Sequence, residues 1–201
     1  MFETLISKLQ EDKYLTLETT PQHEPSMHNI VEKIKKFKID SKVDGFTCTD
    51  NPLAKLKYNS LFAALKLQQE FKKPVIATMT MRDRNKIALQ SDLLGANDFD
   101  IRAILALTGD PANMSDQPNS KGVFEANSLM LLKMIKSFNY GMDFAGRPFK
   151  IEPKQIFPFA VVNAYAKNFG SLEKKMHLKI QIVPVGVIIK PVLDIKMVKK
   201  L

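Results

Sequence analysis

The feature that most constrains this chain is a repeated switch between two hydrophobic periodicities. Six segments show the alternating or continuous apolar pattern of a β-strand, and the segments between them place apolar residues at the spacing of an amphipathic helix. The predicted strands are residues 14–19, 43–49, 74–81, 101–108, 155–163 and 181–190. Successive strand-then-helix units build a parallel sheet covered by helices, so the chain is α/β.

The predicted helices fill the intervals between these strands. They are residues 1–9, 30–37, 53–71, 85–96, 128–138 and 172–179, with a final helix after Asp194. Asn51 and Pro52 supply a cap and first-turn proline for the helix 53–71, and Asp83 can cap the next one. Irregular loops are expected at 111–122 and 139–154. Because no long Gly- or Ser-rich linker divides the 201 residues, we expect a single domain, residues 1–201.

The sequence after the first strand favours a closed barrel over an open doubly wound sheet. The first strand ends in Glu18-Thr19-Thr20-Pro21 rather than in a glycine-rich turn, and no GxGxxG or phosphate-loop motif occurs. We therefore predict a (β/α)8 TIM-barrel type fold with only about six of its eight strands present, since such barrels typically need about 250 residues. Either the barrel is incomplete or a partner chain completes it.

The charge pattern excludes some classes of function. The net charge is +9 and comes mostly from lysine, but the basic runs lack the interleaved arginines and aromatics of a nucleic-acid surface. We expect no nucleic-acid partner and, instead, attraction of an anionic small ligand.

No apolar run is long enough to cross a membrane, and the first residues lack the order of a signal peptide. The lone Cys48 suits a reducing cytoplasm, and no metal site is expected.

Polar residues at the predicted strand ends are the candidates for chemistry, because barrels of this type bind ligands there. Glu18 is either a partly desolvated general acid or a solvated strand-end glutamate. Asp110 follows Gly109, and it can hold a ring rich in N–H groups or simply stabilise a turn. The segment Arg82-Asp83-Arg84-Asn85 is either an anion clamp or a solvent-facing cap.

Four segments, in order along the chain, resemble the methylenetetrahydrofolate reductase family. They are Leu17-Glu-Thr-Thr-Pro, Val43-Asp-Gly-Phe-Thr-Cys-Thr-Asp-Asn-Pro, the stretch beginning Met81-Arg-Asp-Arg-Asn, and Ile104-Leu-Ala-Leu-Thr-Gly-Asp-Pro-Ala. The similarity is greatest to the branch that carries both a TDNP segment (residues 49–52) and an RDRN segment (residues 82–85), and it fades after about Asn168.

The resemblance implies an FAD enzyme of one-carbon and methionine metabolism. Such an enzyme reduces 5,10-methylenetetrahydrofolate to 5-methyltetrahydrofolate with NADH or NADPH as the electron donor. Glu18 matches the acid that protonates the pterin N5, and Asp110 matches an aspartate beside flavin and folate. The matching flavin contacts are Thr49, Leu107, Thr108, Gly109, Asn163 and Lys179.

The sequence also departs from the family pattern. Lys190 stands where the family has a glutamine that contacts the pterin, and a lysine lacks the paired donor and acceptor of an amide. Thr78 and Thr108 replace a histidine and an arginine found in the better-known bacterial branch. The alternative expectation is therefore a truncated, non-catalytic folate- or flavin-binding module, or a subunit that pairs with itself or with a completing partner chain.

Overall fold

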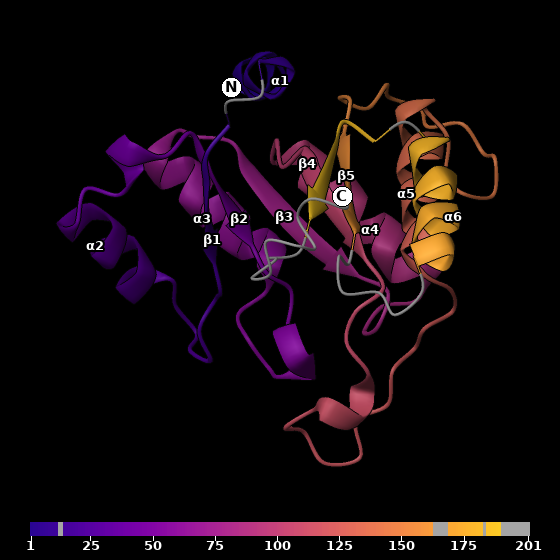
Figure 1. Ribbon diagram of the computed structural model, residues 1–201, viewed down its shortest axis with the longest axis horizontal. Helices are drawn as coiled ribbons and strands as arrows, with labels where there is room; N and C mark the ends of the chain where they lie inside the picture. The colour runs from indigo at the N-terminus through magenta and orange to yellow at the C-terminus, as the bar shows by residue number, and fades with distance from the viewer. Residues whose placement is uncertain (12–13, 163–168, 183, 190–201) are drawn as a thin grey trace.

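The computed structural model describes residues 1–11, 14–162, 169–182 and 184–189. Strands and helices alternate along this part of the chain (Figure 1). The strands are β1 Thr16–Thr19, β2 Gly45–Cys48, β3 Val75–Thr80, β4 Ala103–Leu107, β5 Phe157–Val162 and β6 Gly186–Ile189. The helices are α1 Phe2–Gln10, α2 His28–Lys36, α3 Ser60–Phe71, α4 Lys86–Asp98, α5 Ser128–Asn139 and α6 Phe169–Ile180.

The six strands form one parallel sheet in the order in which they occur in the sequence. In the register of this sheet, Glu18 lies opposite Thr47, Thr47 opposite Ile76, and Ile76 opposite Ala103. Sequential parallel strands joined by helices produce the curved half-barrel predicted from the sequence. All carboxyl ends of the strands therefore lie along one edge.

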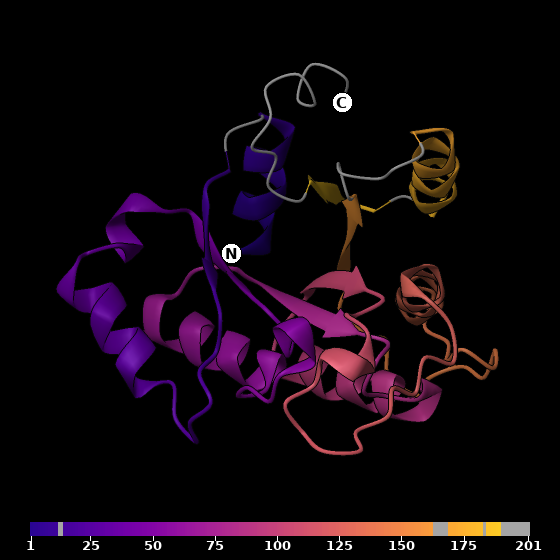
Figure 2. The same ribbon diagram turned by 60° about the horizontal axis from the view of Figure 1, so that its bottom comes forward.

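The outer face of the sheet carries the larger core. Side chains such as Phe46, Met79 and Ile104 alternate outward along their strands and pack against α2, α3, α4 and α5. Ala63 and Ala64 of α3 are fully buried, which lets that helix lie close to the sheet. In Figure 2, α3 and α4 run along one side of the sheet, and α1 lies on the other.

The inner face carries a smaller core near the amino ends of the strands. Phe2 and Leu5 of α1 pack there with Ile76, Ala103, Leu105 and Phe159. Phe2 also stacks on Phe157, with 5.8 Å between ring centroids. The amphipathic pattern at the start of the chain therefore forms the expected helix, and this helix covers the end of the half-barrel opposite the carboxyl ends of the strands.

The predicted helix over residues 53–71 is wrong in its first part. Pro52–Ala54 form a 3₁₀ turn, and the α-helix begins only at Ser60, where the Asn59 side chain accepts from the Leu61 and Phe62 amides. Asn51, Leu53 and Ala54 have positive φ values of 42°, 56° and 57°, which are incompatible with a continuous right-handed helix.

Two further boundaries differ from the prediction. Asn85, not Asp83, caps α4 by accepting from the Ala88 amide at 2.9 Å. The sixth strand begins at Gly186 rather than at residue 181, because α6 extends to Ile180 and is followed by a turn. The predicted helix after Asp194 lies outside the described residues. Within those residues, no helix is long and apolar enough to cross a membrane.

Candidate active site at the carboxyl ends of the strands

Glu18 lies on the inner face of the half-barrel, near the end of β1. Its neighbour in the register is Thr47, and Thr47 donates to Thr16 at 3.4 Å, so these three residues share one face. Thr19 turns to the opposite face, where its hydroxyl contacts the Cys48 sulfur. The Glu18 side chain is exposed, which corresponds to the solvated alternative; any desolvation would have to come from a bound ligand.

The inner face is divided into a polar part and an apolar part. The strands β1, β2 and β3 contribute threonines to it, among them Thr47 and Thr78, which are almost completely buried. The strands β4 and β5 contribute Leu105, Leu107 and Phe159. A flat ring with one polar and one apolar edge would match this division.

Thr49 follows β2 and has a buried hydroxyl without a hydrogen-bond partner in the described part of the chain. Buried hydroxyl groups are normally paired, because an unpaired one loses its hydration without compensation. An orphan polar atom at a strand end is therefore a natural contact point for a ligand. This was one of the positions expected to contact a flavin.

Asp110 faces the turn that follows β2. Its Oδ2 accepts from the Leu53 amide at 2.6 Å, so the carboxylate of one strand end fixes the left-handed turn of another. Gly109 has φ of +97°, which favours glycine. Asp110 therefore stabilises a turn, but it is the turn after β2 and not the one that contains Asp110. Its half-exposed carboxylate can still accept from a ligand.

Leu107 and Thr108 face opposite sides of β4. Leu107 packs with the inner core, whereas the Thr108 hydroxyl accepts from the Ser128 amide at the start of α5 at 3.1 Å. The Thr108 hydroxyl keeps its own proton and a second lone pair for another partner. Leu107, by contrast, has its side chain on the inner face.

The TDNP and RDRN segments are joined by an internal ion pair. Asp50 is buried, and its Oδ2 accepts from Arg84 at 2.7 Å and from both the amide and the hydroxyl of Thr80 at 3.0 Å. Arg84 also pairs with Asp92 at 2.8 Å. Burial alone would lower the pKa of Arg84, but the neighbouring Asp50 carboxylate holds that pKa above its ordinary value.

Arg82 is buried in the same region and bonds to the neighbouring acid. Its Nε and Nη2 donate to the two carboxylate oxygens of Asp83 at 2.7 and 2.5 Å, and Nη2 also donates to the Asn51 carbonyl. The hydrogen bond to Asp83 raises the pKa of Arg82. The solvent-facing cap is present, because exposed Asn85 of this segment caps α4, whereas both arginines are engaged by carboxylates of the protein. The signal in the sequence was the joint presence of the two segments.

Lys179 of α6 reaches the end of β5. Its ammonium donates to the Val161 carbonyl at 2.8 Å, and burial, followed by repulsion from Lys175, lowers its pKa. A partly desolvated cation at this edge is suited to an anionic group of a ligand. Asn163 and Lys190, the two other predicted contacts on this side, lie outside the described residues.

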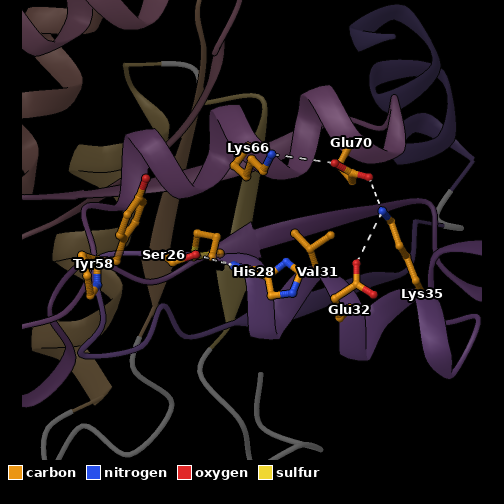
Figure 3. Close-up of a pocket in the computed structure, with 10 residues that line it drawn as sticks. Ser26, His28, Val31, Glu32, Lys35, Tyr58, Lys66 and Glu70 are labelled. Atoms are coloured by element: carbon orange, nitrogen blue, oxygen red, sulfur yellow. Dashed lines mark hydrogen bonds and ion pairs between the residues drawn. The ribbon is translucent and has the colours of Figure 1, made fainter.

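Two other features are separate from this edge. Cys48 is buried among the outer side chains, and burial raises its pKa to about 12, so it is not a nucleophile at neutral pH. A cavity of about 330 Å³ lies between α2 and α3 (Figure 3). There Lys35 lies between Glu32 and Glu70, forming a solvent-exposed ion-pair network.

Among the described residues, no group of acidic, His or Cys side chains is arranged to hold a metal.

The fold and this edge define a class of protein: a parallel α/β half-barrel with its candidate ligand site at the carboxyl ends of the strands. The sequence profile of the methylenetetrahydrofolate reductase family matches residues 3–181. The chain belongs to the methylenetetrahydrofolate reductase family. No curated protein matches it. Membership supports a folate-related reductase role in general.

Proposed function

We propose that the chain binds FAD at the carboxyl ends of its strands and reduces 5,10-methylenetetrahydrofolate to 5-methyltetrahydrofolate, using NADH or NADPH. The observation that carries this proposal is the family match over residues 3–181. The geometry of the strand ends supplies independent support, because the side chains present there suit both a flavin and a folate.

The residues fit a flavin at three points. The orphan hydroxyl of Thr49 needs a partner, and the inner face offers a threonine side and an apolar side to a flat ring. At the end of β5, Lys179 provides a cation for the diphosphate of FAD. When bound, FAD would supply hydride transfer from NADH or NADPH to the folate.

The protein's own residues would then perform the acid–base work. Glu18, on the inner face, would give a proton to N5 of the pterin, and this proton would open the methylene bridge to a reactive cation. A folate stacked over the strand ends would cover the exposed carboxyl and exclude water from it. Asp110, fixed by the Leu53 amide, would orient the rings and balance the developing positive charge.

A second candidate function is a non-catalytic module that binds flavin or folate, alone or as a subunit of another enzyme. The observation that favours it is Lys190, which stands where the resembling family has a glutamine. A lysine donates hydrogen bonds but cannot accept one, so the pterin would be held differently.

The deciding experiment compares the wild-type chain with Glu18→Gln in two anaerobic half-reactions. Both proteins should bind FAD, and NADH or NADPH should bleach the absorbance of the bound flavin. The variant should lose folate reduction by about a hundredfold or more, the usual contribution of a general acid. Glu152→Gln, an exposed glutamate in the loop before β5, is the matched control and should keep both half-reactions.

Three results would count against parts of this proposal. A wild-type chain that stays colourless with FAD would reject flavin chemistry. Bleaching without any folate reduction in the wild type would favour the binding module. Loss of both half-reactions in Glu18→Gln, with folding intact, would contradict the acid role.

A further inference from the structure

Arg82 has an incomplete set of hydrogen bonds. The side chain is 3% exposed, and Nε and Nη2 are paired with Asp83 and with the Asn51 carbonyl. Its Nη1 is buried and has no partner among the described residues. Five buried side-chain atoms in this part of the chain lack a partner, and Nη1 is the one that belongs to a guanidinium.

An unpaired donor on a buried cation is more costly than an unpaired neutral group, so a missing partner there requires an explanation. A second orphan, the Thr49 hydroxyl, belongs to the adjacent TDNP segment. Arg82 is tied to that segment through Asn51, two residues beyond Thr49. These two unpaired donors, Arg82 Nη1 and the Thr49 hydroxyl, therefore belong to the neighbouring segments that follow β2 and β3.

The surrounding charges indicate which acceptor would suit Nη1. Asp83 already pairs with the guanidinium through both oxygens, and Asp50 and Asp110 lie close enough to stabilise its charge further. An additional anion would therefore enter an already acidic environment and be repelled. An uncharged carbonyl oxygen completes the hydrogen bonding without adding charge.

We propose that Arg82 is a ligand-binding residue of the strand-end site, and that its Nη1 donates to a neutral ring carbonyl of the bound heterocycle. The pyrimidine ring of a flavin and the pyrimidinone ring of a pterin both carry such a carbonyl. This inference rests on the proposed function, because it assumes that one of these rings binds above β2 and β3.

The connection between β4 and α5 packs against Arg82. Val123 donates to the Arg82 carbonyl at 2.6 Å, and Glu125 accepts from the Lys86 amide at 3.0 Å. Because Val123 is bonded to the backbone of Arg82, we expect a ligand that binds the Arg82 side chain to change the environment of residues 123–125 as well.

The test uses Arg82→Lys, which keeps the positive charge. The single lysine nitrogen can still pair with Asp83, but no second nitrogen is left to donate to the ring carbonyl of the ligand. Binding of FAD is measured by quenching of its fluorescence, and binding of 5-methyltetrahydrofolate to the FAD-loaded protein by the change in the flavin spectrum. Loss of one charged hydrogen bond should weaken one of these affinities by about tenfold or more. Arg102→Lys, at the amino end of the same sheet, is the matched control and should change neither.

The two arms identify the source of the carbonyl. Weaker FAD binding assigns the carbonyl to the flavin, and unchanged FAD binding with weaker folate binding assigns it to the pterin. Unchanged affinity for both would overturn the role of Arg82 while leaving the proposed function intact. A wild-type chain that binds neither ligand overturns both.

A second measurement applies if Arg82→Lys fails to fold. The chain has four arginines, at positions 82, 84, 102 and 147, so their side-chain NMR signals can be assigned with single Lys variants at the other three positions. In the wild-type protein, FAD or 5-methyltetrahydrofolate should shift the Arg82 guanidinium signal and leave that of Arg102 in place. An Arg82 signal unmoved at saturation by both ligands would refute the inference.

Discussion

The two ends of the half-barrel are built from different kinds of interaction. At the amino ends of the strands, Phe2 and Leu5 are buried against Ile76 and Phe159, and Arg102 stacks over the Phe2 ring at 4.6 Å. The carboxyl ends have the buried ion pair between Asp50 and Arg84, and the orphan donors of Thr49 and Arg82 lie beside it. In barrels of this type, one end serves stability and the other serves ligands, and we expect the same division here.

The amino end should therefore show the largest effect on stability. Leu5→Ala leaves a cavity between α1 and the inner face and should lower the free energy of unfolding by about 3 to 5 kcal/mol. Urea denaturation followed by circular dichroism measures the loss. Ile87→Ala, at a side chain that is 75% exposed, is the control and should change stability by less than about 0.5 kcal/mol.

If Leu5→Ala costs no more than its control, α1 does not belong to the core, and the comparison of the two ends fails. Below its melting temperature, the variant should also keep the ligand affinities of the wild type, because Leu5 lies at the opposite end from Glu18.

The ion pair between the TDNP and RDRN segments is an exception to the division between the two ends, because it lies at the carboxyl end and should still contribute to stability. Asp50→Asn removes the charge that faces Arg84 and should cost about 1.5 to 3 kcal/mol, although it lies at the ligand end. Asp92→Asn, at a partly exposed partner of the same arginine, should cost less than about 1 kcal/mol. Thermal and urea denaturation measure the loss of unfolding free energy in both variants. Equal losses would mean that burial of Asp50 adds nothing to the strength of its ion pair.

The smallest expected difference concerns two glycines with positive φ. A Cβ at Gly109 would lie 2.9 Å from the Cβ of Arg82, whereas nothing lies within 4 Å of one at Gly141. Both alanine variants bear the left-handed strain, but Gly109→Ala also crowds Arg82 and should be less stable than Gly141→Ala by about 1 kcal/mol or more. Denaturation midpoints measure this difference, and equal midpoints would mean that the turn after β4 yields to the added methyl group.

Much of the architecture follows from local sequence pattern. The alternation of apolar residues predicts all six strands, and it places Glu18 at the end of the first one. The position of Asp110 follows from the Gly109 turn in the same way. These features depend on neighbouring residues, so a single sequence contains the information for them.

The features that were missed depend on distant contacts. Leu53 has a left-handed backbone conformation and therefore is not part of an α-helix. Its amide donates to Asp110, which is 57 residues away. The cap of α4 is a local exception, because Asp83 pairs with its neighbour Arg82 and Asn85 caps the helix instead. Asp50 and Arg84 meet only because β2 and β3 are adjacent in the sheet. Local propensity does not encode such pairings.

The contact of α1 with the inner face also bears on how the chain folds. Phe2 and Leu5 precede all six strands in the sequence, yet the surface that they cover includes Phe157 and Phe159. Closing so long a loop is entropically expensive, and folding slows as the separation between contacting residues increases. We therefore expect α1 to dock late, so that a helix which precedes every strand in the sequence is among the last to reach its native position.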